Sequence, residues 1–367
     1  MVDAKILNSI SSRARALEAS KIREVAELGM KKDGVLPLWF GEGAWSTNPL
    51  IVDAAIAALK AGNHMYQPNN GVMALRQAIC AYSNKLLGSR LKPAQVTVTP
   101  SGMQGLMLTA EFLVTPGDRV VAVEPGWPNI IGAFKATGAE ITSVTIVPKD
   151  GHWTLDVDGL IAELTPGTKA VVINSPNNPT GVVYDKNTWL GIVEVCIQKD
   201  LWLISDEVYD SQVWEGEHIS PRSLPKMEPR TLVIGSMSKS HAMTGSRVGW
   251  VCGPETVITH LINLATHTTY GVPGYIQDAA NFALNQGSKL EMEVAAPFDR
   301  RRKIAVKLIA MQKIIKSVPC SGAMYMMLDI RNTGLTGEVF ANRLLDKKNI
   351  AVMPGESFGR SAKGHIR

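Results

Sequence analysis

The sequence is poor in cysteine and contains no long uninterrupted apolar run. Its 367 residues include four widely separated cysteines, Cys80, Cys196, Cys252 and Cys320, with neither a Cys-x-x-Cys pair nor a Cys/His spacing typical of metal ligands. We expect free buried thiols in a reducing compartment, the cytoplasm, and no metal site. No apolar stretch is long enough to span a bilayer, and residues 1–30 lack the apolar core of a secretory signal. The sequence therefore argues against a disulfide-stabilised and a membrane-bound protein.

Strong charge is also absent. Charged residues make up 19% of the chain, and the formal net charge of +5 is not gathered in Lys/Arg runs with interleaved aromatic residues. A nucleic-acid-binding groove is therefore not expected. Hydrophobic residues, at 45%, are instead abundant enough for one large globular domain or two.

Short runs of β-forming residues alternate with helical stretches from residue 95 onward. The runs predicted as strands are residues 96–99, 119–123, 140–144, 170–173, 201–205, 232–235 and 248–252. The helices predicted between them include residues 128–137, 156–164 and 186–199. This alternation predicts an α/β fold with a mostly parallel seven-stranded sheet flanked by helices.

The two ends of the chain are predicted to build a smaller α+β domain. Its predicted helices are residues 8–30, 288–317 and 336–347, and its predicted strands are residues 36–40, 323–329 and 350–353. We expect residues 1–45 to form an N-terminal arm and part of the small domain. The large domain is expected to span residues 46–285, and the rest of the small domain residues 286–367.

A lysine follows one of the predicted strands. The segment Ser236-Met237-Ser238-Lys239 comes directly after residues 232–235, and open α/β sheets carry ligand chemistry at such strand ends. The hydroxyls of Ser236 and Ser238 and the guanidinium of Arg247 are donors that suit a phosphate dianion. Taken alone, a Ser-x-x-Lys sequence more simply indicates a surface loop with a solvated lysine. Its meaning depends on motifs elsewhere in the chain.

Two further motifs follow strands of the predicted sheet. Ser101-Gly102-Met103 opens a helix after residues 96–99, and the free N–H groups of a helix start suit an anion. Trp127 follows residues 119–123, where a flat ligand ring could rest on the indole. A glycine turn that binds nothing and a tryptophan of the core are the simpler interpretations of each motif alone.

Amide, carboxylate and phenol groups follow the next two strands. Asn178 lies in the turn-rich segment 175–181, and its amide could donate to a ring oxygen. Asp206 and Tyr209 follow residues 201–205 and converge if the chain turns there. Together with Lys239, these groups fit a planar ring that carries an aldehyde, a ring nitrogen, a phenolic oxygen and a phosphate. Pyridoxal 5'-phosphate has all four features.

Several segments together match one known family. They are Tyr66 with Gly71 and Leu75-Arg76, Pro116 to Asp118, Pro125 to Pro128, Asn178 to Gly181, Asp206 to Tyr209, Ser236 to Lys239 and Gly245 to Arg247. In them the sequence resembles the class I and II aminotransferases of the fold-type-I pyridoxal phosphate enzymes, in the broad aspartate aminotransferase superfamily. The resemblance covers nearly the whole chain, from residue 36 to residue 367.

The resemblance implies a role for each motif. Lys239 would hold the cofactor as a Schiff base and move a proton at the substrate α-carbon, while Asp206 keeps the ring nitrogen protonated. Tyr209 and Asn178 would bond the ring oxygen, and Trp127 would stack on the ring. The residues implied to hold the phosphate are Ser101, Gly102, Met103, Ser236, Arg247 and, from the neighbouring subunit, Tyr66. The resemblance therefore implies a homodimer with shared active sites.

The substrate-binding residues are also implied by the resemblance. Arg367 matches an arginine that grips the substrate α-carboxylate, for which a planar guanidinium is well suited. Gly41 matches a position whose backbone lies against the substrate, and Asn178 borders the same place. Family members generally continue for another strand and helix, so we expect the chain to be truncated after Arg367. At a chain end that residue would fray.

The implied activity is transfer of the α-amino group of an L-amino acid to a 2-oxo acid by a ping-pong mechanism. Residues 264–269 match a region that holds a second arginine in dicarboxylate-specific relatives, and they contain none here. A C–S β-lyase or a cyclopropane-forming synthase has the same cofactor residues and is the main alternative. A serine acyl enzyme is disfavoured because its S-D-N and K-T-G motifs are absent. A DNA-binding regulator is disfavoured because no domain fits before residue 36.

Overall fold

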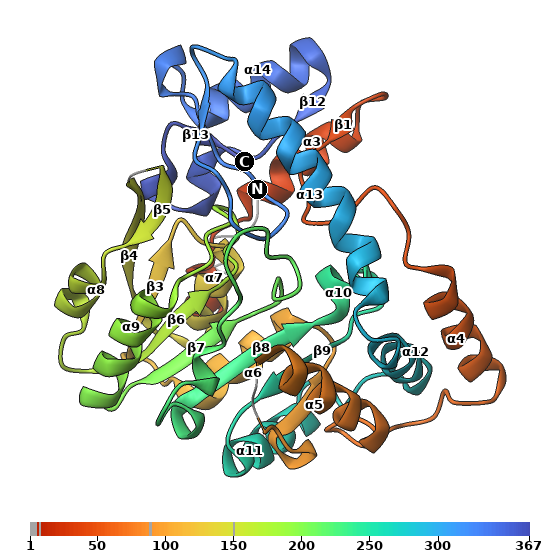
Figure 1. Ribbon diagram of the computed structural model, residues 1–367. Coiled ribbons are helices and arrows are strands. Elements are labelled where there is room, and N and C mark those ends of the chain that lie inside the picture. The colour runs from red at the N-terminus through yellow and green to blue at the C-terminus, as the bar shows by residue number, and fades with distance from the viewer. Residues whose placement is uncertain (1–5, 7–8, 88–89, 150) are drawn as a thin grey trace.

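A computed structural model describes residue 6 and residues 9–87, 90–149 and 151–367 of the protein. Its centre is an eight-stranded sheet in the order β2-β9-β8-β7-β6-β3-β4-β5 (Figure 1). The strands are β2 (Val96–Thr99), β3 (Arg119–Glu124), β4 (Glu140–Lys149), β5 (His152–Leu155), β6 (Thr168–Asn174), β7 (Trp202–Asp206), β8 (Thr231–Ser236) and β9 (Gly249–Cys252).

The pairing within this sheet is mostly parallel. Strands β4, β3, β6, β7 and β8 run parallel to one another, whereas β9 runs antiparallel to both of its neighbours, β8 and β2. All seven predicted strands are present, so the predicted fold class is confirmed. Strand β5, which was not predicted, adds an eighth strand because it pairs antiparallel with the extended end of β4.

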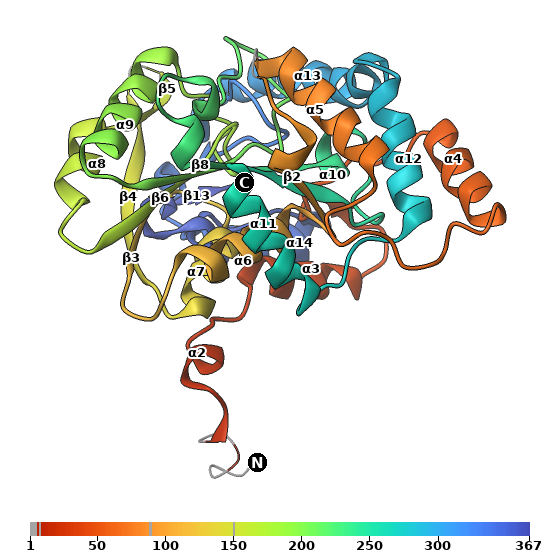
Figure 2. The same ribbon diagram turned by 90° about the horizontal axis from the view of Figure 1, so that it is seen from below.

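Helices cover both faces of the sheet (Figure 2). One face packs on α6 (Gly102–Leu113), α7 (Pro128–Thr137) and α11 (Glu255–Thr266). The other packs on α5 (Met73–Leu87), α8 (Val157–Glu163), α9 (Lys186–Gln198) and α12 (Gly274–Asn285), with α4 (Pro49–Lys60) lying against α12. Successive residues of a strand point to opposite faces of the sheet. Val120 packs in the core on the face covered by α6, α7 and α11, and Val121 packs in the core on the other face.

Both ends of the chain contribute to a smaller unit beside the sheet. Strand β1 (Leu36–Pro37) pairs parallel with β12 (Ile350–Ala351), and β10 (Lys316–Ser317), β11 (Leu328–Asp329) and β13 (His365–Ile366) form an antiparallel sheet. The remaining helices are α2 (Ser12–Arg15), α3 (Lys21–Met30), α10 (Met237–Ser240), α13 (Lys289–Ala310) and α14 (Gly337–Lys348). The predicted domain limits at residues 45–46 and 285–286 stay a prediction.

The helix predicted over residues 8–30 is wrong in its middle. Residue 8 lies outside the described residues, and the rest forms α2 and α3 with a break between them. The break has a local cause, because Ser20 is extended and its Oγ accepts a hydrogen bond from the backbone N–H of Arg23 at 3.3 Å. Such a cap begins a new helix rather than continuing an old one.

Four other predicted elements are shorter than expected. The helix predicted over residues 288–317 ends at Ala310, because Lys316 and Ser317 pair with β11 instead. The strand predicted over 323–329 is reduced to Leu328–Asp329, since Ala323 has a left-handed φ of 55°. The strands predicted over 36–40 and 350–353 are reduced to the two-residue pair β1 and β12. Among the described residues, no helix is long and apolar enough to cross a bilayer.

Candidate functional site

A cavity of about 260 Å³ lies at the carboxyl ends of β6, β7 and β8, where the first turn of α6 also begins. Segments from both ends of the chain complete its wall. Its lining residues are Ile22, Trp39, Phe40, Gly41, Ser101, Gly102, Met103, Leu106, Trp127, Asn174, Asn178, Asp206, Val208, Tyr209, Ser236, Ser238, Lys239, Thr244, Arg247, Tyr325 and Arg367. All the predicted site residues except Tyr66 are thus brought together.

Lys239 is held by the short helix α10 directly after β8. Ser236 caps this helix, because its Oγ accepts from the backbone N–H of Ser238 at 3.1 Å. The Nζ of Lys239 donates to the carbonyl oxygen of Gly41 from the N-terminal part of the chain. A side chain at Gly41 would collide with the Oη of Tyr325, at 1.9 Å from an ideal Cβ. The amine therefore sits beside a backbone position that only glycine can occupy.

Asp206 is the last residue of β7 and is 1% exposed. Burial raises the pKa of its carboxyl to about 7, and the charge of Glu207 acts in the same direction. The hydrogen bond from the N–H of Val208 and the charge of Lys239 act in the opposite direction and lower this pKa. The side chain of Asn174 donates to the Asp206 carbonyl oxygen at 3.0 Å and fixes the strand end. A buried carboxyl with one backbone donor has room for a cationic N–H partner in the cavity.

Two buried phenols meet at the back of the cavity. The hydroxyls of Tyr209 and Tyr325 lie 2.6 Å apart, and burial together with Tyr325 raises the pKa of Tyr209 well above its ordinary value. Tyr325 was not among the predicted site residues, because residues 323–329 were interpreted only as a strand of the small domain. Its contact with Tyr209 spans 116 residues and leaves no local pattern.

One end of the cavity is suited to an anion. Ser101 caps α6, a helix of 12 residues, and its Oγ accepts from the backbone N–H of Gln104 at 3.1 Å. Ser236, Ser238 and Arg247 line the same cavity, and the guanidinium of Arg247 donates to the carbonyl oxygen of Thr244. Helix-start N–H groups, hydroxyls and a fixed cation form a site for a phosphate-sized anion.

Arg367 lies on the opposite wall and is not frayed. Its backbone N–H donates to the carbonyl oxygen of Met353 at 2.8 Å, so the expectation of a frayed residue is wrong for this structure. Its guanidinium donates to Asn178 Oδ1 at 3.1 Å and to the carbonyl oxygen of Trp39, and it stacks 4.4 Å from the ring centre of Tyr325. A guanidinium fixed in this way can present its remaining N–H groups to a carboxylate.

Tyr66 lies away from this cavity. Its side chain is 87% exposed and packs edge-to-face against Tyr270, with ring centres 5.2 Å apart. Within this chain it therefore contacts none of the cavity groups that it was predicted to join.

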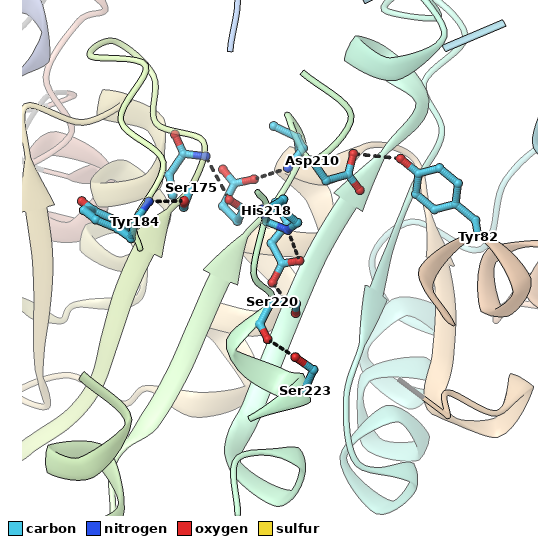
Figure 3. Close-up of polar contacts among 11 residues, drawn as sticks. Tyr82, Ser175, Tyr184, Asp210, His218, Ser220 and Ser223 are labelled. Carbon is cyan, nitrogen blue, oxygen red and sulfur yellow. Dashed lines mark hydrogen bonds and ion pairs between the residues drawn. The ribbon is translucent and has the colours of Figure 1, made fainter. Parts of the chain in front are cut away.

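A buried polar network lies behind the cavity (Figure 3). The Glu207 carboxylate pairs with Nε2 of His218 at 2.9 Å and accepts from Ser220 Oγ at 2.7 Å. Asp210 Oδ1 accepts from the hydroxyl of Tyr82 at 2.8 Å. Nothing in the sequence indicated this network, because the partners of Glu207 and Asp210 lie on other segments. No cluster of three metal-ligating side chains occurs in the described part of the chain.

The donor set fits a flat, phosphorylated ligand with a reactive carbonyl. An amine, a buried carboxyl and a phenol surround the centre of the cavity, an indole borders it, and an anion site closes one end. At Gly102, a Cβ would lie 3.2 Å from Val208 Cγ1, so the backbone of α6 approaches the cavity closely. These residues have the chemical groups that such a ligand needs.

Comparison with known proteins gives a consistent result. A sequence model of the family described as aminotransferase class I and II matches residues 37–367. An arginine–pyruvate transaminase from Pseudomonas aeruginosa is 40% identical over 333 residues, which cover 91% of this chain and 84% of the relative. An aspartate/prephenate aminotransferase from Thermus thermophilus is 32% identical, with 98% and 94% covered. The structure of the aspartate aminotransferase from Thermus thermophilus with maleate superposes with a TM-score of 0.90 at 30% identity, covering 98% of this chain and 94% of that one.

Proposed function

Because the chain belongs to the class I and II aminotransferases, we propose that it uses pyridoxal 5'-phosphate, bound in the cavity around Lys239, to move the α-amino group of an L-amino acid to a 2-oxo acid. The observation that carries the proposal is the meeting of Lys239 and Asp206 in one cavity with an anion site at its end. When bound, pyridoxal phosphate supplies an electron-accepting ring that stabilises negative charge at the substrate α-carbon.

In this proposal the protein groups divide the work of holding the cofactor. Asp206 holds the protonated ring nitrogen, Tyr209 and Asn178 donate to the ring oxygen, and Trp127 lies against the ring face. The phosphate is held by Ser101, Gly102, Met103, Ser236 and Arg247. The buried position of Asp206 supports its part, since a carboxylate in low dielectric binds an N–H cation more strongly than one in water.

The substrate is proposed to bind between Arg367 and Gly41. The guanidinium grips the α-carboxylate, and the contacts of Arg367 with Asn178 and Tyr325 hold it in place. Lys239 Nζ lies beside Gly41, so it is placed to take up and return the α-proton. Trp39, Gly41 and Arg367 line the part of the cavity in which this step would take place.

An absorbance spectrum of the protein loaded with pyridoxal phosphate tests the proposal. We expect a visible band that is lost in Lys239→Ala and that one class of L-amino acids bleaches with formation of the amine form of the cofactor. The exposed Lys186→Ala is the matched control and should keep the band. Absence of a band in the wild type would contradict the cofactor assignment. Release of a keto acid without the amine form would instead favour a β-lyase.

We also propose a homodimer in which Tyr66 reaches the phosphate of the partner's site. Tyr66 is fully accessible in the single chain, and the segment around it exposes many large apolar side chains. These are Leu50, Val52, Ile56, Leu59, Met65, Met73 and Tyr270, each at least 42% exposed. Exposed apolar surface of this extent is typical of an interface.

Light scattering after gel filtration tests the dimer. Ile56→Asp should give a monomer, because the substitution would bury a charge at the subunit interface. The affinity of this monomer for pyridoxal phosphate should be about tenfold or more lower, because the phosphate loses one hydrogen-bond donor. Ile161→Asp, on the distant helix α8, is the control and should stay dimeric. A monomeric wild type with full cofactor affinity would contradict the proposal.

For the amino donor we propose an L-amino acid with a long cationic side chain. The relative that is 40% identical is named for arginine. A second cavity of about 780 Å³ adjoins the first, and Met103 lines both. Two ionisable side chains of its lining are half-buried, and both carry carboxyl groups: Glu124 and Glu356. The cationic side chains that line it are all exposed: Lys21, Lys135 and Arg360. A buried hydroxyl without a hydrogen-bond partner, that of Ser357, also borders it.

Kinetics with matched amino acids test this choice. We expect kcat/KM to be about tenfold or more higher for L-arginine than for L-citrulline, which has the same side-chain length and no charge. Glu124→Gln should lower the value for L-arginine alone, while Glu111→Gln, an exposed change on α6, should leave both unaltered. Equal use of both amino acids by an active enzyme would reject the cationic donor but not the transamination.

A cytoplasmic location completes the proposal. Its support is that all four cysteines are buried and free, as expected in a reducing compartment.

A further inference from the structure

Glu207 is a buried acid that the proposed chemistry does not use. Its side chain is 2% exposed, and both carboxylate oxygens have a buried partner. Oε2 pairs with Nε2 of His218 at 2.9 Å, and Oε1 accepts from the hydroxyl of Ser220 at 2.7 Å. An acid buried this deeply between an imidazole and a hydroxyl is held in one position by its hydrogen bonds.

Glu207 is also the residue that follows Asp206. The carboxyl of Asp206 lines the cavity, whereas Glu207 bonds to the loop that carries His218 and Ser220. Successive side chains at a strand end point to opposite sides, so fixing one fixes the direction of the other. The backbone N–H of Glu207 adds a further tie, because it donates to the carbonyl oxygen of Ile234 at 2.9 Å.

Other charged or titratable groups surround this pair from neighbouring elements. From the same loop, Asp210 lies near His218 and is hydrogen-bonded to Tyr82 of α5. From α10, the charge of Lys239 acts on Asp206. From β9, Cys252 interacts electrostatically with Glu207 and Arg222.

A second buried acid faces the network from α13. Glu291 interacts with Asp210 and Lys85, and its Oε1 lies 3.9 Å from Nε2 of His241. Of the two histidines near these acids, His218 is the one that contacts Glu207 directly. Glu207 is the carboxylate next to Asp206 in the chain.

We propose that Glu207 is a positioning residue for Asp206: anchored by His218 and Ser220, its carboxylate fixes the end of β7 so that Asp206 faces the cavity, and its negative charge makes Asp206 a stronger hydrogen-bond acceptor for the cofactor ring. This inference rests on the proposed function, because it concerns the group that holds the ring nitrogen.

The electrostatics agree with this geometry. Burial is the main cause that raises the pKa of Asp206 to about 7, and the charge of Glu207 raises it further. The pKa of His218 is itself raised: burial opposes its charge, but the hydrogen bond and charge of Glu207 and the charge of Asp210 outweigh that effect. The charge of Glu207 therefore acts both on His218 and on Asp206.

Binding of pyridoxal phosphate to the apo-protein, measured by equilibrium titration from pH 5.5 to 9, tests the proposal without any turnover. Affinity is expected to fall at low pH as Asp206 becomes protonated. Glu207→Gln keeps the shape of the side chain and removes its charge, with one accepting oxygen replaced by a donating amide. It should therefore move the acidic inflection to lower pH by on the order of one unit. His218→Gln removes the imidazole that holds Glu207 Oε2, so it should lower affinity at every pH because the end of β7 is less well fixed.

Two variants separate charge from anchoring and from folding. Ser220→Ala removes a hydrogen bond to Glu207 and no charge, so it should leave the inflection in place while lowering affinity at every pH. Tyr184→Phe removes a buried hydroxyl that has no hydrogen-bond partner, so neither affinity nor inflection should change.

Three outcomes would overturn the inference. An unmoved inflection in Glu207→Gln would show that the charge has no effect on Asp206, and an equal shift in Ser220→Ala would assign the effect to anchoring alone. A shift to higher pH in Glu207→Gln would reverse the sign of the argument. If His218→Gln does not fold, Glu207→Gln decides the question alone. Failure of the proposed function is distinct, since the wild type would then bind no pyridoxal phosphate at any pH.

Discussion

Arg367 is held by contacts that fix the plane of its guanidinium as well as its charge. Hydrogen bonds to Asn178 Oδ1 and to the carbonyl oxygen of Trp39 use part of its donors, and the rings of Tyr325 and Phe358 lie 4.4 and 4.9 Å away. A flat, doubly stacked cation recognises a carboxylate by two parallel hydrogen bonds, which an ammonium group cannot reproduce.

Arg367→Lys should therefore raise KM for the amino donor about tenfold or more, while kcat changes less. The loss of one charge-assisted hydrogen bond is worth about 1.5–3 kcal/mol. Steady-state kinetics with several donor concentrations measure the two parameters separately. Arg343→Lys is the matched control, because Arg343 is exposed on α14 and lines neither cavity. An unchanged KM in Arg367→Lys would show that the α-carboxylate binds elsewhere.

Helix α3 links the N-terminal segment to the site at the scale of a single element. It places Ile22 in the cavity wall, and Gly29 packs so closely on Trp39 that a Cβ there would lie 2.4 Å from the indole. Its first turn depends on Ser20, whose Oγ accepts from the N–H of Arg23.

Ser20→Ala should release the first turn of α3 and lower its stability by about 1 kcal/mol. Amide hydrogen exchange should become faster for residues 21–24, with little change in the midpoint of global unfolding, since the cap is exposed. Ser20→Asn, which keeps a capping oxygen, should restore slow exchange. Equal exchange in all three proteins would mean that packing on Trp39, and not the cap, begins the helix.

Buried acids give the whole molecule a pH-dependent stability. The carboxyl of Glu291 is 7% exposed, and burial followed by the charge of Asp210 raises its pKa to about 7. The folded protein then binds a proton more tightly than the unfolded chain does. Stability contributed by this group is therefore present at low pH and is lost as pH rises from its ordinary pKa of 4.5 through about 7.

Glu291→Gln should be more stable than the wild type above pH 7, by on the order of 1 kcal/mol after allowance for solvent screening. The difference in the free energy of unfolding should vanish near pH 4.5, where the wild-type carboxyl is protonated. Denaturant unfolding of the apo-protein at a series of pH values measures it. Glu163→Gln, an exposed change on α8, should follow the wild type at every pH. A variant less stable at pH 8 would assign Glu291 a favourable ionic contact instead.

The strands and most helices of the large sheet could be predicted from the sequence because their signals are local. Apolar runs such as 120–123 and 232–235 are buried on both faces, and turn residues end them. The failures have local causes that compete with the pattern. At Ser20 a cap interrupts an amphipathic stretch, and at Ala323 a left-handed backbone ends a run that is otherwise apolar.

The sequence by itself determined the α/β architecture and the order of the motifs around Lys239, because strand periodicity and turn chemistry act over a few residues. Only the tertiary structure decided which distant groups meet. Tyr209 contacts Tyr325 across 116 residues, and Arg367 contacts Asn178 across 189. It also decided the acidity of Asp206, since the pKa of a carboxyl depends on how deeply the complete core buries it and on which charges surround it.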